Sequence, residues 1–188
     1  MIEIVDYQER WPTEFRAIGA RLRELLGPAA LRIDHIGSTA VPGLAAKDVI
    51  DVQITVKDLD PSLERGLAEG SFVRRAWTSD HRPPGVELAA PQLEKRFFAP
   101  PEGERPANIH VRVAGRFNQR YALLCRDYLR AHPAAARAYA VVKRALARIV
   151  GDDVDAFYEV KDPVFDILMA GAEEWAAATG WRPGPSDA

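Results

Sequence analysis

The segment HIGSTAVPGLAAKDVIDVQITV, residues 35–56, holds the residue types and spacing that best fit chemistry on a phosphate. Gly37 lets the backbone turn sharply and approach a ligand closely, because glycine has no side chain to clash. Ser38 adds a hydroxyl and a backbone N–H, and a helix starting nearby would direct its positive end at an anion. We predict that Gly37 and Ser38 bind phosphate; an ordinary β-turn is the alternative.

Asp51 lies in the apolar run VIDVQI, where a carboxylate is out of place unless a cation meets it. Metal-assisted phosphoryl or nucleotidyl transfer uses carboxylate ligands to hold Mg²⁺ against the phosphates. Asp51 is therefore the predicted Mg²⁺ ligand and a predicted catalytic residue, with a salt bridge inside the core as the alternative. Gln53 shares its strand face but carries no charge, which weakens a two-metal interpretation.

His110 and Arg112 alternate with apolar residues in NIHVRV, so both are expected on one face of a strand. A histidine there could orient or deprotonate an acceptor, and an arginine could bind phosphate. Arg96, on the preceding strand, is expected to share this face. The alternative is a solvated sheet face that simply carries polar residues.

Three more residues are candidates for ligand binding. His35 precedes the Gly-Ser turn and is either a site residue or a buried histidine bonded to the backbone. Lys47, at the end of the Pro/Gly loop, and Lys161, before the last predicted helix, could each reach a phosphate, although either is more often a surface lysine. We predict that Ser38, Asp51 and His110 line one cleft, with side-chain atoms within roughly 10 Å of each other.

The elements that must position these residues follow from hydrophobic periodicity and turn signals. Helices are predicted over residues 11–26, from 61 to 70, 119–131, 133–150 and from about 163 to 180, and strands over 31–36, 49–56, 72–78, 93–99 and 109–113. Residues 79–91, rich in proline and polar residues, are predicted to form a loop. This order predicts an α+β fold in a single domain over residues 1–180, followed by a flexible tail at 181–188.

Composition narrows the class of partner. The chain has 188 residues, 47% of them hydrophobic, which is enough for one domain with a real core. A formal net charge of −2 gives no field that would attract nucleic acid, so a polynucleotide partner is not expected. One cysteine, no apolar membrane span and an acidic start without a signal peptide predict a cytoplasmic protein with no membrane partner. The sequence does not set the oligomeric state.

Several blocks in order resemble one family: IVDYQERWPTEF, HIGST-VPGL, NIHVRV, RDYLRAHPAAARAYAVVKRALA and residues 158–167. The chain resembles, over nearly its whole length, the GrpB family (glutamate-rich protein B), whose members look like small nucleotidyltransferase-fold proteins. The resemblance implies a nucleotidyltransferase-like mixed sheet flanked by helices, with a C-terminal helical segment. It also implies lysines at the positions of Lys47 and Lys161.

Two departures from the family pattern bear on activity. Nucleotidyltransferases place a second acid two residues after the first, where this chain has Gln53, and relatives carry His-x-His where it has Asn108-Ile109-His110. The resemblance implies a protein that binds a nucleoside triphosphate with Mg²⁺ and transfers a nucleotidyl group to an unknown small acceptor. The rival is a non-catalytic binding or scaffold module, linked to coenzyme A metabolism because relatives occur fused to dephospho-CoA kinase. The sequence leaves open whether the protein is an enzyme.

Overall fold

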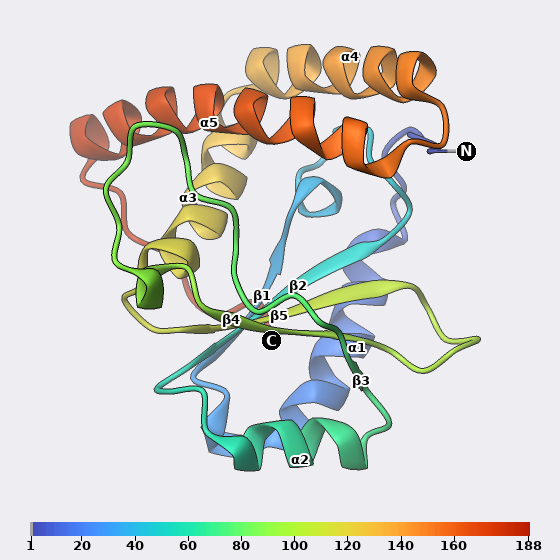
Figure 1. The fold of residues 1–188 in the computed structure, drawn as a ribbon, viewed down its shortest axis with the longest axis vertical. Helices are drawn as coiled ribbons and strands as arrows, with labels where there is room; N and C mark the ends of the chain where they lie inside the picture. The colour runs from blue at the N-terminus through green and yellow to red at the C-terminus, as the bar shows by residue number, and fades with distance from the viewer. Residues whose placement is uncertain (1) are drawn as a thin grey trace.

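The computed structural model describes residues 2–188 and shows a mixed five-stranded sheet in the order β1-β2-β5-β4-β3 (Figure 1). Helices α1 and α2 lie on one side of the sheet, and α3, α4 and α5 lie on the other side (Figure 1). The predicted α+β class is confirmed. The strands are β1 (Arg32–Ile36), β2 (Ile50–Val56), β3 (Val73–Arg74), β4 (Lys95–Ala99) and β5 (Ala107–Val113), and the helices are α1 (Trp11–Leu26), α2 (Pro61–Glu69), α3 (Phe117–Ala131), α4 (Pro133–Val150) and α5 (Val154–Thr179).

The two central strands, β2 and β5, run parallel, whereas the other neighbouring pairs are antiparallel. Their register pairs Val52 with Ile109 and Gln53 with His110. Because side chains alternate between faces, one face of each strand is apolar and the other is polar. The apolar face packs under α1 and α2, and the polar face is directed toward α3, α4 and α5.

The main core lies between the sheet and the first two helices. α1 buries an apolar stripe that includes Trp11, Phe15 and Leu22, with proline in its first turn, as the periodicity predicted. The helix is fixed to the chain ahead of β2 by the Trp11 indole N–H, which donates to Asp48 Oδ1 at 2.7 Å. α2 begins at the predicted cap, Asp60, whose carboxylate accepts from the Ser62 backbone N–H at 2.6 Å.

The three C-terminal helices form a second apolar cluster with the loop between β1 and β2, through residues such as Leu44, Leu124 and Met169. α5 begins at Val154, earlier than the predicted start near Pro163. The Asp153 carboxylate caps this helix by accepting from the Ala156 backbone N–H, so Pro163 lies inside the helix rather than at its first turn. Lys161 is therefore a residue of α5.

The C-terminal segment differs from the predicted flexible tail. Residues 184–188 lie along the outer side of β1, where the Asp187 backbone N–H donates to the Ile33 carbonyl at 3.1 Å. The Asp187 carboxylate accepts from the His35 backbone N–H and from Arg126 on α3. Sequence reasoning missed these contacts because the segment has no periodicity of its own. In the part of the chain described, none of the helices has the length and apolar character required to cross a membrane.

Candidate functional site

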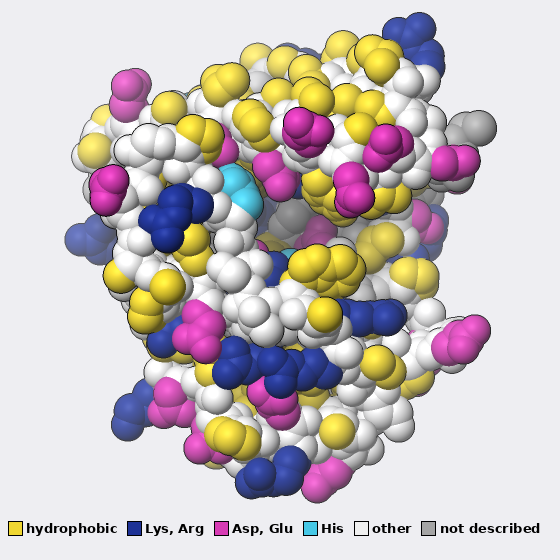
Figure 2. All heavy atoms as spheres, viewed as in Figure 1, with side chains coloured by type: hydrophobic (Ala, Val, Ile, Leu, Met, Phe, Trp, Pro, Cys, Tyr) yellow, Lys and Arg dark blue, Asp and Glu magenta, His cyan; other side chains and the backbone are white. Residues whose placement is uncertain are grey.

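A cleft of about 770 Å³, here called the central cleft, lies between the polar face of the sheet and the C-terminal helices. Figure 2 shows the hollow below the outer helices. Ser38, Asp51 and His110 line it together, as the sequence predicted, and Lys47, Arg112 and Lys161 also line it. The polar face of the sheet therefore forms the floor of a ligand-sized space.

Asp51 is held at the floor of the cleft by the neighbouring strand. Asn108, its partner in the β2–β5 register, donates to Asp51 Oδ1 at 2.8 Å, and His110 Nε2 lies 3.8 Å from the same oxygen. Burial would raise the pKa of Asp51, but His110 and Asn108 outweigh it and hold that pKa below its usual value. Asp51 is therefore ionised at neutral pH.

His110 is neutral at the same pH. Burial, assisted by the charge of Arg112, lowers the pKa of His110 to about 4. Arg112 donates to His110 Nδ1 at 3.4 Å, which leaves the proton of the neutral ring on Nε2, facing Asp51. The neutral ring therefore presents an N–H, and not a lone pair, toward Asp51. A catalytic role for His110 stays a prediction.

The Gly37–Ser38 turn closes against Asp51. Gly37 has φ +70°, and a Cβ at this position would lie 2.3 Å from Asp51 Oδ2. Only glycine permits both the turn and the close approach. Ser38 Oγ accepts from Lys143 Nζ at 2.8 Å. The turn, the carboxylate and a lysine of α4 therefore converge at one end of the cleft.

Lys143 is the site residue that sequence reasoning missed. Its side chain is 4% exposed, it donates to Ser38 Oγ and to the Ala45 carbonyl, and no carboxylate pairs with it among residues 2–188. Burial, with the charge of Lys161, lowers the pKa of Lys143 to about 7. Lys143 lies three or four residues from Ala140, Tyr139 and Leu146, on the buried stripe of α4. A lysine on the apolar stripe of a predicted helix is the sequence feature from which this site residue could have been found.

Lys47 and Lys161 face each other at the α5 side of the cleft. Lys47 Nζ lies over the Phe157 and Tyr158 rings, 4.3 and 4.7 Å from their centroids. Lys161 Nζ lies 4.9 Å from the Tyr158 ring and pairs with Asp162 at 2.8 Å. Burial, then the charge of Lys161, lowers the pKa of Lys47. Both lysines line the cleft, and their contact with a phosphate stays a prediction.

Arg112 is engaged below the floor of the cleft. Its guanidinium donates to Gln53 Oε1 at 2.7 Å and to both oxygens of Asp80, at 2.8 and 3.0 Å. Lys95 Nζ donates to Asp80 at 2.6 Å, and these two cations outweigh burial and hold the pKa of Asp80 far below its usual range. Asp80 lies in the segment expected to be a mobile loop, so its structural role was missed. Arg112 is therefore ion-paired.

Arg96 and His35 lie outside the central cleft. Arg96 pairs with Val111 in the β4–β5 register and therefore faces α2, where it donates to Glu64 at 2.9 Å. The prediction that it shares a face with His110 is wrong, because Lys95 and Phe97 occupy that face instead. His35 packs under α1, its ring stacked on Phe15 at 4.7 Å.

His35 has the environment of a core histidine. Its Nε2 lies 3.0 Å from the Thr39 hydroxyl, and burial lowers the pKa of His35 to about 4. The second interpretation of this residue, a buried histidine, fits its placement; the expected direct role in the site does not. Through Thr39 it contacts the turn that holds Gly37 and Ser38, but it does not line the cleft.

The donor set at Asp51 suits one Mg²⁺ and not two. Mg²⁺ is commonly held by one or two carboxylates together with substrate phosphates, and Asp51 Oδ2 faces the predicted phosphate turn. At the second-acid position, both ends of the Gln53 amide are occupied, by Arg112 and by the Gln119 carbonyl. Across residues 2–188, no group of three or more His, Cys, Asp or Glu residues is arranged to hold a metal. A second ion has no ligand here.

A family model described as GrpB protein matches residues 1–170 of the chain. This chain belongs to the GrpB family. Among solved structures, it resembles the conserved protein GrpB from Enterococcus faecalis, with a TM-score of 0.74, 24% identity, and coverage of 92% of this chain and 99% of that chain. It also resembles Cid1 in complex with its short product ApU, with a TM-score of 0.51, 14% identity, and coverage of 77% and 43%. GrpB therefore has a nucleotidyltransferase-like fold.

Two relatives are longer proteins that this chain matches over about half of their length. It is 38% identical over 197 residues to a dephospho-CoA kinase of Mycolicibacterium paratuberculosis, covering 97% of this chain and 48% of that protein. It is 32% identical over 174 residues to UPF0157 protein YqkA of Bacillus subtilis, covering 93% and 48%. The GrpB chain spans about half the length of these relatives.

Replacing Gly37 by alanine is expected to disturb the site as well as the fold. Gly37 has φ +70° and ψ −170°, a conformation that is almost exclusive to glycine and costs another residue about 1–3 kcal/mol of stability, and Gly37→Ala also drives its Cβ into Asp51. Gly43→Ala is the matched control, because Gly43 has φ +76° with nothing within 4 Å of the added atom. Urea unfolding should show a larger loss for Gly37→Ala; equal losses in the two variants would refute the close packing of the turn on Asp51.

The buried His110 should make stability depend on pH. Between pH 6.5 and about 4 the unfolded chain takes up a proton that folded His110 does not, so stability falls as pH falls. Between pH 7 and 5, His110→Asn should lose about 1–2 kcal/mol less than the parent. Ring nitrogen NMR supplies the direct check, with the His110 signal assigned by its absence from the variant. A His110 midpoint near pH 6.5 would contradict the buried, neutral ring.

Proposed function

We propose that the central cleft binds a nucleoside triphosphate, with one Mg²⁺ shared between the phosphates and Asp51, and that a nucleotidyl group passes to a small acceptor. One observation carries the proposal: buried Lys143, with no carboxylate partner among the described residues, donates to the hydroxyl of Ser38. A desolvated lysine without a counter-ion is costly unless an anion binds beside it. The Gly37–Ser38 turn is where that anion would lie.

Charge in the cleft is distributed in a way that favours a polyphosphate. Arg112 and Lys95 share the single carboxylate of Asp80, so that group keeps one net positive charge, whereas Lys47 and Lys143 each have no carboxylate partner in the described part of the chain. Lys161 adds a third cation at the same end, although it pairs with Asp162. More of the uncompensated charge therefore lies near Ser38, and several phosphates in a row would meet it.

Transfer would then take place at Asp51. The acceptor hydroxyl oxygen would bond to the α-phosphorus as the bond from that phosphorus to the bridging oxygen breaks, and pyrophosphate would leave. The hydroxyl proton would pass to the Asp51 carboxylate, which His110 and Asn108 hold in place. Bound Mg²⁺ would neutralise phosphate charge as it develops. Lys47, Lys143 and Lys161 would retain the departing phosphates.

A second candidate function is favoured by Gln53. The contact between Gln53 Oε1 and Arg112 places an ion-paired guanidinium where a second acid would otherwise hold a second metal. A GrpB protein with this arrangement could bind a nucleotide without transferring any part of it. Its similarity to about half of a dephospho-CoA kinase would then associate such a binding module with coenzyme A metabolism.

Calorimetry with ATP, GTP, CTP and UTP in the presence of MgCl₂ tests binding. We expect at least one nucleotide to bind, and Lys143→Gln to weaken it about tenfold or more, since it loses a charge-assisted contact to phosphate. Lys57→Gln is the matched control, because Lys57 is an exposed lysine in the turn after β2. Asp51→Asn should reduce the gain in affinity that MgCl₂ gives. Failure of all four nucleotides to bind would remove the proposal, as would a Lys143→Gln variant that binds like the parent.

Pyrophosphate release separates the two functions. With the bound nucleotide, MgCl₂ and a pool of small hydroxylated metabolites, the enzyme proposal expects pyrophosphate from the parent protein. It also expects a faster release from Gln53→Asp, which supplies a second carboxylate, than from Gln53→Asn, which is equally short and neutral. Nucleotide binding without pyrophosphate from the parent or either variant would leave the binding module as the function.

A further inference from the structure

A second hollow, here called the rim pocket, adjoins the central cleft on the side of β3 and β4. It has a volume of about 510 Å³ and is lined by the segment after β3 and the turn between β4 and β5. Val49, Trp77, Phe97 and Asn108 line both spaces, so the two adjoin each other. Asn108 is also the residue that donates to Asp51. One residue, Asn108, therefore both borders the rim pocket and contacts the carboxylate at the floor of the cleft.

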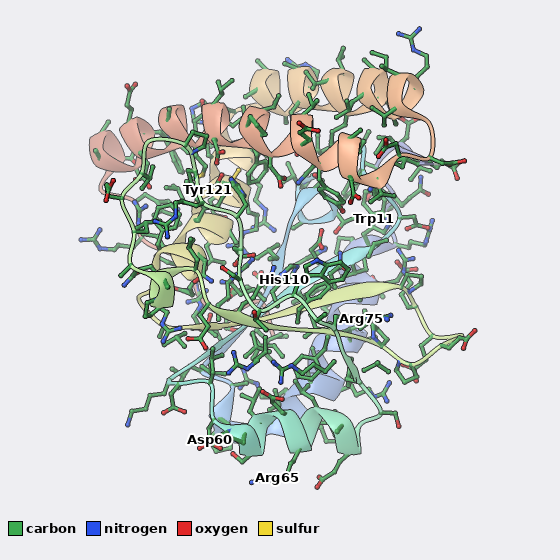
Figure 3. The ribbon with its side chains drawn as sticks, in the orientation of Figure 1. Trp11, Asp60, Arg65, Arg75, His110 and Tyr121 are labelled. Carbon is green, nitrogen blue, oxygen red and sulfur yellow. The ribbon has the colours of Figure 1, made fainter. Side chains whose placement is uncertain are left out.

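A row of side chains across the sheet links the rim pocket to the site. The Arg75 backbone N–H donates to the Phe97 carbonyl at 2.8 Å, which extends the β3–β4 pairing by one residue. Phe97 lies opposite His110 in the β4–β5 register, so Phe97 and His110 lie on the face of the central cleft. Arg75 is at the outer end of this row and lines the rim pocket; Figure 3 labels Arg75 and His110.

The wall of the rim pocket nearest the site is aromatic. Trp77 is 66% exposed, an unusual state for so large an apolar side chain, and its ring meets Phe97 edge to face at 5.7 Å. Phe97 in turn lies 4.9 Å from the His110 ring. The indole is fixed on one side and open to the pocket, so it offers a stacking surface to a flat ring.

Arg75 supplies the free charge of the rim pocket. It makes no side-chain hydrogen bond or ion pair with any residue between 2 and 188, whereas its neighbour Arg74 is bound by Glu64. The other arginine of the pocket, Arg105, is held by Glu14 and Asp48. Glu102 also lines the pocket, from the exposed turn after β4. An unpaired guanidinium beside an open indole is suited to an anionic aromatic ligand.

We propose that the rim pocket binds the acceptor, and that the acceptor is a small molecule with a flat aromatic ring and an anionic group, of the kind found in a nucleoside monophosphate. The ring stacks on Trp77, the anion meets Arg75, and a hydroxyl extends past Asn108 toward Asp51. This assignment deepens the proposed function, because the central cleft supplies the donor, but binding in the rim pocket does not require that function to hold.

Fluorescence titration with adenosine monophosphate tests the assignment. The central cleft is first saturated with an ATP analogue whose α–β bridge cannot be cleaved, so that the monophosphate reports on the rim pocket. Stacking of adenine on Trp77 should quench tryptophan emission, and Trp77→Phe should abolish the quenching. Adenosine and ribose 5-phosphate serve as probes that retain only the ring or only the anion.

Arg75→Gln is the decisive variant, with Arg74→Gln as its matched control, because Arg74 is adjacent but bound to Glu64 on the opposite face. Arg75→Gln should weaken binding of the monophosphate about tenfold and leave the affinity for adenosine unchanged, since a single charge-assisted contact is lost. Arg74→Gln should bind like the parent. Binding of the ATP analogue should be the same in all three proteins, because Arg75 lies outside the central cleft.

The outcomes separate this assignment from the proposed function. Monophosphate binding that is insensitive to Arg75→Gln and Trp77→Phe overturns the rim pocket, as does displacement of the monophosphate by the ATP analogue. If ATP, GTP, CTP and UTP all fail to bind but the monophosphate binds through Arg75, the rim pocket stands and the donor proposal falls. If both bind independently, the two-substrate arrangement stands.

Discussion

Parallel pairing of β2 with β5 brings Asp51, Asn108 and His110 together on one buried face. The neighbouring elements of the site provide the polar contacts that this burial requires. Each of these groups loses water on folding and must recover polar contacts from its neighbours. Asn108 donates to one oxygen of Asp51, His110 lies 3.8 Å from the same oxygen, and the turn at Gly37 approaches the other. The opposite face of the same strands forms the main apolar core, and its burial stabilises the sheet and so offsets the cost of burying the polar face.

A second consequence of this face is the ion network beneath the cleft. Burying Gln53 or Arg112 alone would be costly, and they are stabilised because Arg112 donates to both Gln53 and Asp80. Asp80 lies in the segment between β3 and β4, which has little regular structure. Its bond to Arg112 therefore also fixes that segment to the sheet. Lys47 and Lys143, which have no carboxylate partner among residues 2–188, lie at the other end of the cleft and give the site a charge gradient along its length.

Much of the fold could be predicted because it depends on periodicity and on turn residues. The helix at residues 11–26, the strands that hold Asp51 and His110, and the cap at Asp60 followed from local patterns that tertiary contacts did not override. The predicted strand face of Arg96 was wrong, because a shift of one residue along a strand moves a side chain to the other face. Nothing in the sequence around Arg96 determines that register. The expected direct role of His35 in the site also depended on the strand face, and His35 lies on the apolar face of β1.

Other parts of the site could not be obtained from local sequence at all. Asp80 is 32 residues from its partner Arg112, and Lys143 is 105 residues from Ser38, so both contacts depend on how separate segments fold back on each other. Lys143 gave a partial signal because a charge on the apolar stripe of a helix needs a polar partner. Asp80 gave none, because an acidic residue in a proline-rich segment is ordinary.

The segment that lies along β1 has a consequence for how this sheet meets other chains. Exposed strand edges present unpaired N–H and C=O groups that can recruit a strand from a second molecule. Residues 186–188 bond to both the N–H and the C=O of Ile33, and the opposite edge strand, β3, is only two residues long. Neither edge of the sheet offers a long template for strand addition. Within longer proteins such as those it resembles, a domain of this kind would associate with its neighbours through helices and loops rather than by extending its sheet.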